Sequence, residues 1–247
     1  MASANWKRFW ACSCSHGAFI HQGHAAAALE HKAAWKPHTT VHLGDAFDCT
    51  CLRGGADPHD QDVSLAEDIA CGKRFLEDLR PDVFLMGNHE ARLWRVSKQQ
   101  RGVIGQLAEA GIADITGFLG RIKCGWLPYH VRKGVFELGN TKLLHGYAIG
   151  IGAVRKHAAI YGRCVFGHLH RVEEAPAQRF DDGTLAVTIG WLGDPERLDY
   201  SDTRPTILNW EPSWCYGYVN ERTGSTVWWL ARCIDGEWLL PEGVKHV

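Results

Sequence analysis

The sequence predicts an α/β protein, and two observations support this. An apolar run at residues 8–13, an Ala-rich amphipathic segment at 22–36 and a β-branched run at 39–43 follow one another as strand, helix and strand. Further short apolar runs at 83–86 and 163–166 are each followed at once by polar residues, as strands of an open sheet are where they approach a site. The length of 247 residues allows one large domain with a buried core, so we expect a single domain over residues 1–247.

Local signals place the other helices. Ser64 stands before an amphipathic segment that runs to about Arg80, and Glu67 occupies the capping-box position. The segment 91–122 has a helical pattern that four glycines interrupt, so we expect several short helices there. Residues 91–123 could form a helical cap over a site.

The C-terminal half is predicted to be mainly β. Gly139-Asn140 separates two apolar runs, 131–138 and 141–144, which indicates a hairpin. A helix at about 152–161 leads to the strand at 163–166. The segment 172–189 indicates two strands, and from about residue 171 we expect β-rich structure.

Composition limits the partners and the compartment. The formal net charge is −1 and the pI about 6.9, so there is no global positive field for nucleic acid or an acidic membrane, although a local basic patch could exist. The N-terminus shows no apolar signal region, and no stretch reaches transmembrane length. Nine cysteines are then expected to be reduced thiols of a cytoplasmic protein. Fourteen histidines favour metal binding.

Five polar clusters each follow an apolar run. They are Cys14-Ser15-His16-Gly17, Gly44-Asp45, Gly87-Asn88-His89-Glu90, His145-Gly146 and Gly167-His168-Leu169-His170. In a layered α/β protein such strand ends converge on one edge. Asp, Asn and His side chains supply the mixed oxygen and nitrogen ligands that suit Zn, Fe or Mn. The clusters together therefore predict a metal site.

The order of these clusters resembles that of the calcineurin-like metallophosphoesterases, over roughly residues 9–170 with a β-rich tail. The resemblance implies a four-layer α/β/β/α sandwich with two mixed β-sheets flanked by helices. It also implies two divalent or trivalent metal ions, namely Zn, Fe or Mn, as cofactors.

Residue by residue, the resemblance implies two ligand sets that share Asp45 as a bridge. The first set is His16, Asp45 and His170, and the second is Asp45, Asn88, His145 and His168. His89 would stay free of metal and act as the general acid, while a hydroxide activated by the two metals attacks the phosphorus.

One position departs from the pattern. The family's first motif is Asp-x-His, and this chain has Cys14 at the Asp position. A thiolate would ligate Zn or Fe and bias the first site toward softer metals. The alternative is a weakened or empty first site. The two Cys-x-Cys pairs, Cys12 with Cys14 and Cys49 with Cys51, could form a separate zinc site or be core and loop thiols.

Three further residues have two interpretations each. Arg92 could clamp a substrate phosphate or belong to a solvated helix face together with Arg95 and Lys98. Asp48 could orient a ligand from the second coordination shell or be an ordinary loop residue. Glu90 is expected to begin a helix rather than to take part in catalysis.

The function we expect is hydrolysis of a phosphate ester by a metal-dependent enzyme. A phosphodiester, including a nucleotide or nucleic acid, is favoured, because the segment from Gly44 to Cys49 has two carboxylates but lacks the Arg-Gly that follows them in protein phosphatases. The alternatives are a phosphomonoesterase or serine/threonine protein phosphatase, and a non-catalytic metal-binding scaffold with a degenerate first site. The expected partners are the substrate and possibly nucleic acid, with no membrane; the sequence does not determine an oligomeric state.

Overall fold

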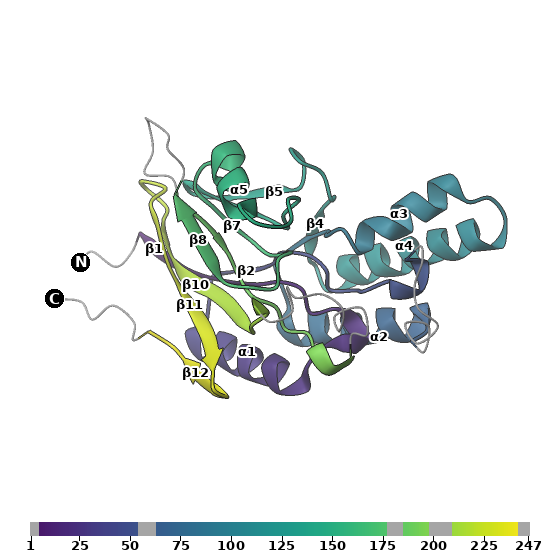
Figure 1. Ribbon diagram of the computed structural model, residues 1–247, viewed down its shortest axis with the longest axis horizontal. Coiled ribbons are helices and arrows are strands. Elements are labelled where there is room, and N and C mark those ends of the chain that lie inside the picture. Colours follow the sequence, from purple (N-terminus) through teal and green to yellow (C-terminus); the bar gives the residue numbers. More distant parts are fainter. Residues whose placement is uncertain (1–4, 54–62, 177–184, 198–208, 242–247) are drawn as a thin grey trace.

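Two mixed β-sheets pack face to face, and helices cover their outer faces (Figure 1). The structure is a computed structural model that describes residues 5–53, 63–176, 185–197 and 209–241. These layers form the α/β/β/α sandwich that the resemblance implies.

The first sheet has seven strands and carries both ends of the described chain. Its strands are β1 (Trp6–Cys12), β2 (Thr39–His42), β3 (Val83–Leu85), β4 (Gly125–Leu127), β10 (Ser213–Asn220), β11 (Thr226–Ile234) and β12 (Glu237–Leu239). Their order is β12-β11-β10-β1-β2-β3-β4. Strands β1 to β4 are parallel, and β10 pairs antiparallel with β1. The C-terminal strands therefore extend the first sheet.

The second sheet has five strands in the order β5-β6-β7-β9-β8. They are β5 (Val135–Leu138), β6 (Thr141–Leu144), β7 (Cys164–Phe166), β8 (Glu173–Pro176) and β9 (Leu185–Thr188). The hairpin of β5 and β6 turns at Gly139, whose φ of 58° is in the region that favours glycine. The expected turn between β8 and β9 lies outside the described residues.

The helices divide between the two outer faces and one end of the sandwich. They are α1 (Gln22–Trp35), α2 (Leu65–Leu79), α3 (Glu90–Gln99), α4 (Val103–Arg121) and α5 (Ala153–Tyr161), with short 3-10 turns at Gly17–Phe19, Thr50–Leu52 and Pro195–Arg197. Helix α5 packs on the second sheet, and α3 and α4 form a hairpin that projects beyond the sheets (Figure 1). The side chain of Ser64 caps α2 by accepting a hydrogen bond from the Glu67 N–H.

The core has one layer for each interface of the sandwich. Between the sheets lie Phe9, Val41, Leu85, Leu143 and Val165, all fully buried. A larger cluster lies between the first sheet and the helices on its outer face, and a smaller one lies under α5. Burial on both faces explains why these strands are continuous apolar runs in the sequence.

The expectation of several short helices at 91–122 was wrong, because α4 continues for 19 residues. Gly102, with φ of 83°, does separate α3 from α4, whereas Gly105, Gly111 and Gly117 lie within α4 and do not break it. A Cβ atom at Gly111 would lie only 3.2 Å from Leu93 of α3, so glycine there permits close approach of the two helices. The strand expected at 131–138 begins only at Val135, and the short edge strand β4 was not predicted.

Candidate metal centre

The five polar clusters meet at the carboxyl ends of the parallel strands of both sheets. Three of them follow β1, β2 and β3 after one intervening residue, and the other two follow β6 and β7 directly. Because the two sheets pack with these ends on the same side, residues far apart in sequence come within hydrogen-bonding distance. The structure brings together every residue that the sequence predicts as a ligand, and His89.

The backbone of this region is unusual. Five non-glycine residues with proposed ligand roles have φ between 53° and 70°, in the left-handed region. These residues are Cys14, His16, Asp45, His168 and His170. Such conformations cost free energy and are concentrated at functional sites, where the surrounding structure holds them. The strained turns aim the side chains inward.

Glycines beside these turns leave no room for a larger residue. A Cβ at Gly87 would collide with the Asp45 carboxylate, and a Cβ at Gly44 would lie 2.6 Å from His145 Nδ1. Glycine at both positions therefore allows the backbone to pass directly behind the cluster.

Among the residues that the structure describes, three groups of side chains have ligand atoms that lie within 4.8 Å of one another, and every member is buried. The groups are Cys14 with His16 and His170, Cys14 with Asp45 and His145, and His16 with Asp48 and His89. Cys14 belongs to two of the groups, so its sulfur lies between the two predicted ligand sets. The sequence did not predict this central position.

On the first side of the centre, two imidazoles face each other. His16 Nε2 lies 3.0 Å from His170 Nε2, and His16 Nδ1 lies 2.6 Å from Asp48 Oδ2. The His170 ring stacks on Trp191, with centroids 4.8 Å apart and an interplanar angle of 9°. Asp48 and Trp191 thus hold the two rings with their Nε2 atoms close to each other.

On the second side, His145 Nε2 lies 2.9 Å from Asn88 Oδ1 and 3.1 Å from Asp45 Oδ2. Its Nδ1 lies 2.9 Å from the Leu43 carbonyl oxygen, which accepts the ring proton and leaves Nε2 as the coordinating atom. The ring of His168 lies beside that of His145, with centroids 5.1 Å apart. The Asp45 carboxylate thus lies beside His145 and within 4.8 Å of the Cys14 sulfur, and its role as a bridge between the two sides stays a prediction.

His89 lies between two carboxylates. Its Nδ1 lies 2.8 Å from the Asp48 carbonyl oxygen and 3.1 Å from Asp48 Oδ2, and its backbone N–H donates to Asp45 Oδ1 at 2.9 Å. Because Nδ1 faces two oxygens it carries a proton, so Nε2 is the atom that can bind or release another. Burial alone would lower the pKa of His89, but Asp45 and Asp48 outweigh it and raise the pKa to about 9.

Arg92 is the basic residue of α3 that reaches this pair. Its Nη2 lies 3.3 Å from His89 Nε2, and its Nη1 donates to the Asp48 carbonyl oxygen at 2.9 Å. Arg95 and Lys98 are exposed on the same helix. The three residues therefore do not form one functional stripe, because only Arg92 has such contacts with the centre.

Two buried carboxylates support the loops from behind. Glu90 accepts hydrogen bonds from the backbone N–H groups of Gly87, Asp45 and Phe47, at 2.7, 3.0 and 2.9 Å. Asp68 of α2 does the same for the loops of the first and second motifs, by accepting from Ala18, Asp48 and Cys49. Sequence reasoning missed both supports, because a carboxylate in the first turn of a helix usually serves the helix dipole.

The protonation states suit metal ligands. Burial lowers the pKa of His16 and of His170, and it lowers that of His168 to about 3, so these rings are neutral, the form that coordinates metal. Burial would raise the pKa of Asp45, but His145 and His89 hold it well below its usual range.

Cys14 is different, because burial and the nearby Asp45 raise the pKa of its thiol. A cation would have to be present to give the thiolate. Two buried atoms, His170 Nδ1 and Asp48 Oδ1, have no hydrogen-bond partner among the described residues. The donor set of thiolate, imidazole, carboxylate and amide oxygen fits Zn, Fe or Mn.

Other candidate sites did not gain support. All nine cysteines are free thiols, and Cys12 and Cys49 are buried while Cys51 is exposed. Among the described residues, no group of possible ligands joins the two Cys-x-Cys pairs.

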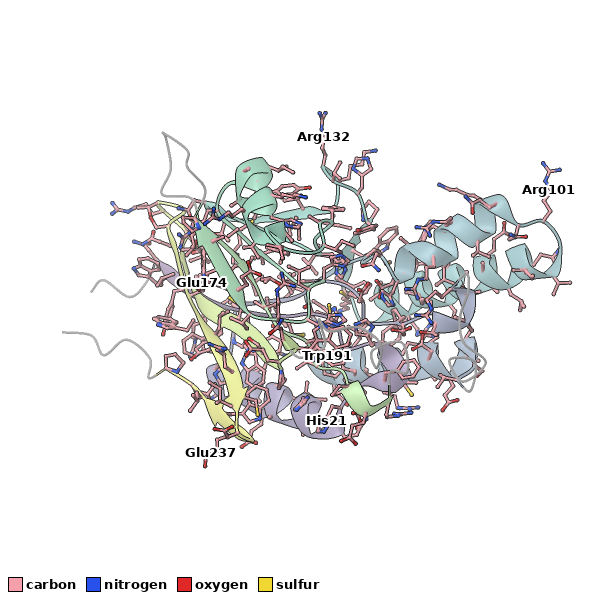
Figure 2. All side chains as sticks on the ribbon, viewed as in Figure 1. His21, Arg101, Arg132, Glu174, Trp191 and Glu237 are labelled. Carbon is pink, nitrogen blue, oxygen red and sulfur yellow. The ribbon has the colours of Figure 1, made fainter. Side chains whose placement is uncertain are left out.

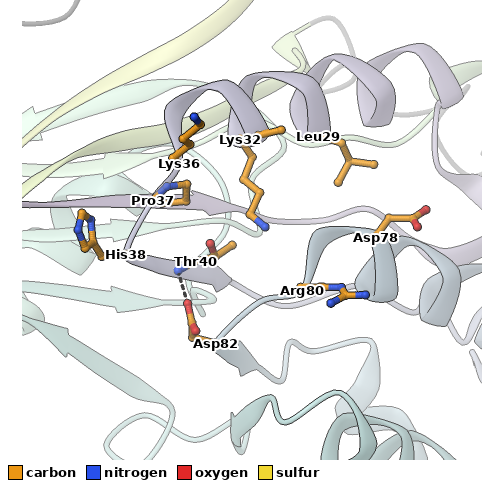
Figure 3. Close-up of a pocket in the computed structure, with 10 residues that line it drawn as sticks. Leu29, Lys32, Lys36, Pro37, His38, Thr40, Asp78, Arg80 and Asp82 are labelled. Carbon is orange, nitrogen blue, oxygen red and sulfur yellow. Dashed lines mark hydrogen bonds between the residues drawn. The ribbon is translucent and has the colours of Figure 1, made fainter.

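A cavity of about 610 Å³ lies at the opposite edge of the first sheet, where α1 and α2 end (Figure 3). There Lys32 Nζ donates to the carbonyl oxygen of Leu79, at the end of α2, so this cation serves a helix terminus.

The sequence matches the family described as calcineurin-like phosphoesterases over residues 7–246. No curated protein matches the sequence significantly.

Solved structures that resemble this one share little sequence with it. An archaeal phosphodiesterase has 13% identity and a TM-score of 0.46, and the alignment covers 90% of this chain and 99% of that one. A metallophosphoesterase from Sphaerobacter thermophilus has 13% identity and a TM-score of 0.47, with 91% and 87% covered. A single mutant of Vps29 from Entamoeba histolytica has 13% identity and a TM-score of 0.49, with 94% and 96% covered.

Proposed function

The chain belongs to the calcineurin-like phosphoesterase family, and on that premise we propose that it hydrolyses a phosphate ester, with a phosphodiester as the preferred substrate. The observation that carries the proposal is the position of His89. It lies among the predicted ligands and between Asp45 and Asp48, with its Nε2 atom available for proton transfer. A scaffold that only holds metal has no use for such a group.

In this proposal Cys14, His16 and His170 would hold a first metal ion, and Asn88, His145 and His168 would hold a second. Asp45 would serve both ions as a shared ligand. The bound metal pair supplies Lewis acidity toward the phosphoryl oxygens and lowers the pKa of water. Asp48 keeps the His16 ring oriented through its 2.6 Å contact with Nδ1.

His89 acts as the general acid. A raised pKa of about 9 keeps its imidazole protonated at neutral pH. The Nε2 proton is transferred to the departing oxygen as the P–O bond breaks, so the leaving group departs as an alcohol. The Asp48 contacts at Nδ1 hold the ring in place during this transfer.

Arg92 binds a phosphoryl oxygen in this scheme. Its guanidinium lies beside His89 with its side chain 15% exposed, so it can reach a substrate that approaches Nε2. The residue that follows Asp48 is Cys49, a buried thiol. This position therefore supplies no second guanidinium to a substrate phosphate. One negative charge on a diester needs less cationic support than two on a monoester, which favours diesters, including nucleotides and nucleic acid.

Purified protein loaded with Zn, Fe or Mn tests the proposal with two substrates. We expect faster turnover of bis-p-nitrophenyl phosphate than of p-nitrophenyl phosphate. Good turnover of the monoester with none of the diester would instead identify a phosphomonoesterase or protein phosphatase.

The second candidate function is a non-catalytic metal-binding scaffold. The observation that favours it is the thiol of Cys14, a buried residue at the position where the family's first motif has a carboxylate. Fewer than two ions per chain, together with no hydrolysis of either ester after addition of Zn, Fe or Mn, would select this alternative.

A further inference from the structure

The charge of the chain is distributed unevenly. Residues 92–163 contain twelve Lys and Arg but three Asp and Glu, a net charge of +9, whereas the whole chain has a formal net charge of −1. The expectation of no membrane partner rested in part on that overall balance, while nucleic acid was kept as a possible partner. The middle of the chain is instead strongly basic, as is typical of proteins that bind an anionic surface.

Part of this basic segment forms a single face around α5. Three pieces of chain contribute to it: the loop before β5, the loop after β6, and the outer side of α5. We call it the α5 face, and its exposed residues are Val131, Arg132, Lys133, Ile149, Ile151, Arg155, Lys156 and Ile160. Figure 2 shows Arg132 projecting from the same side of the molecule on which Figure 1 places α5.

Specific contacts hold the three pieces together. The Tyr161 hydroxyl, at the end of α5, donates to the Val131 carbonyl oxygen at 2.9 Å. The Tyr129 hydroxyl donates to the Gly146 carbonyl oxygen at 3.1 Å, and the Tyr129 ring stacks on that of Tyr147. The α5 face is therefore a packed surface rather than a set of independent loops.

The loop after β6 presents two isoleucines to solvent. Ile149 is 73% exposed and Ile151 is fully exposed. Gly150 and Gly152 flank Ile151, each with φ of 79°, and a Cβ at either would meet no atom within 4 Å. The loop thus holds an apolar side chain away from the protein, where it can contact a partner together with the other apolar residues of the face.

The α5 face also carries cations. Arg155 and Lys156 lie on the first turn of α5, and Arg132 and Lys133 lie on the neighbouring loop, all exposed. In the parts of the chain that the structure describes, none of the four forms an ion pair with a carboxylate. Their charge is therefore available to a partner.

We propose that the α5 face docks on an anionic lipid bilayer, with Ile149 and Ile151 inserted among the headgroups and the four cations on lipid phosphates. Exposed aliphatic side chains on a face that also carries Lys and Arg match an interface that is apolar inside and anionic at its surface. A surface for nucleic acid would offer aromatic rings to stack on bases, rather than exposed isoleucines. No helix in the described ranges is long and apolar enough to cross a membrane, so the contact is peripheral.

The α5 face adjoins the metal centre. His145 begins the loop that carries the two isoleucines, and its ring lies 5.8 Å from that of Tyr129, which packs under the face. Docking would bring the His145 side of the centre close to the plane of the lipid headgroups. The inference concerns binding alone and does not depend on the proposed activity.

Co-sedimentation of the full chain with vesicles tests the proposal. We expect binding to vesicles of phosphatidylcholine mixed with phosphatidylglycerol, little binding to phosphatidylcholine alone, and weaker binding as salt increases. The double variant Ile149→Ser with Ile151→Ser should lose about tenfold or more in affinity. The double variant Arg155→Gln with Lys156→Gln should also bind more weakly, with a smaller dependence on salt.

A matched control is Ile234→Ser, which changes an exposed isoleucine on β11 and should bind as the parent does. Thermal unfolding of each variant establishes that the fold is retained. Absence of binding to the anionic vesicles at low salt would overturn the proposal. It would also be overturned if the isoleucine variant bound normally while single-stranded DNA displaced the protein from vesicles, because the face would then be a nucleic-acid surface.

Discussion

The backbone N–H of His168 donates a hydrogen bond to the Sγ atom of Cys14, with an N···S distance of 3.3 Å. This contact joins the first and last motifs across the two sheets. A backbone donor directed at sulfur stabilises the thiolate relative to the thiol, and so opposes the effect of burial. This hydrogen bond favours the form of Cys14 that can bind a metal ion, once a cation neutralises the negative charge of the thiolate.

We predict that Cys14→Asp retains two metal ions per chain and shifts the preferred metal toward Mn, because a carboxylate is a harder ligand than a thiolate. Cys14→Ala should lose the first ion. Elemental analysis after dialysis measures both. Cys49→Ala, which removes a buried thiol outside the three ligand groups, is the matched control. Loss of metal from the Cys14→Asp protein would count against the ligand role.

Replacement of His89 by Ala should reduce turnover of the diester by roughly 10²- to 10⁴-fold, the usual contribution of a positioned acid. Metal content should not change, because His89 is not a ligand in the proposed scheme. His130→Ala removes an exposed imidazole on the loop before β5 and should leave turnover unchanged. Unchanged turnover of the His89→Ala protein would falsify the general-acid role.

Much of this centre could be predicted from sequence because its chemistry is local. Each ligand follows a short apolar strand, and the strand ends of a layered sheet converge, so Asp45, Asn88, His145 and His170 could be placed together without coordinates. Local sequence signals, such as amphipathic segments and the capping box at Ser64, likewise placed α1, α2 and α5 within one or two residues of their observed ends.

Contacts between distant elements could not be predicted. The central position of Cys14 depends on how closely the two sheets approach each other. The three hydrogen bonds of Glu90 and the support of the loops by Asp68 depend on which backbone N–H groups the loops direct inward. The continuity of α4 through its glycines depends on packing against α3, which outweighs intrinsic helix propensity.

Asp48→Asn should affect both metal binding and proton transfer, because Asp48 contacts His16 and His89. Metal affinity at the first site should fall by roughly 10- to 100-fold, as is usual when a carboxylate that orients a histidine ligand is removed. The pKa of His89, about 9 with the carboxylate present, should fall.

The direction of the resulting pH effect follows from the role of His89 as the general acid. A general acid must be protonated, so activity is lost as pH rises through the pKa of His89. In Asp48→Asn the alkaline limb of the profile of kcat against pH should therefore move to lower pH. Measurement at saturating metal separates this shift from weakened metal binding. Asp78→Asn, at an exposed carboxylate of α2, should leave the limb in place.

Arg92→Gln should raise KM for the diester by roughly 10- to 100-fold, the range that corresponds to one hydrogen bond to a charged group. Inhibition by inorganic phosphate should weaken in parallel. Arg95→Gln is a close control, since Arg95 lies one turn further along α3 and is exposed. Equal effects of the two substitutions would indicate a general electrostatic contribution of α3 rather than a specific clamp.

Asp68 gives a prediction about stability that is independent of catalysis. Burial raises the pKa of its carboxyl from 3.8 to about 6 in the folded chain, in spite of the backbone hydrogen bonds that it accepts. The folded state therefore binds more protons than the unfolded state between these values. Its contribution to the free energy of unfolding is fully present below about pH 4 and is lost as pH rises through about 6, a difference on the order of 3 kcal/mol.

The test compares Asp68→Asn with the parent protein by urea denaturation across this pH range, with a chelator present so that metal release does not contribute. Asn resembles the protonated carboxyl and does not titrate, so the variant should gain stability relative to the parent as pH rises. Asp235→Asn, at an exposed carboxylate, should follow the parent at every pH. A difference between Asp68→Asn and the parent that stays constant with pH would mean that Asp68 is ionised in the folded protein throughout, held by the N–H groups of Ala18, Asp48 and Cys49.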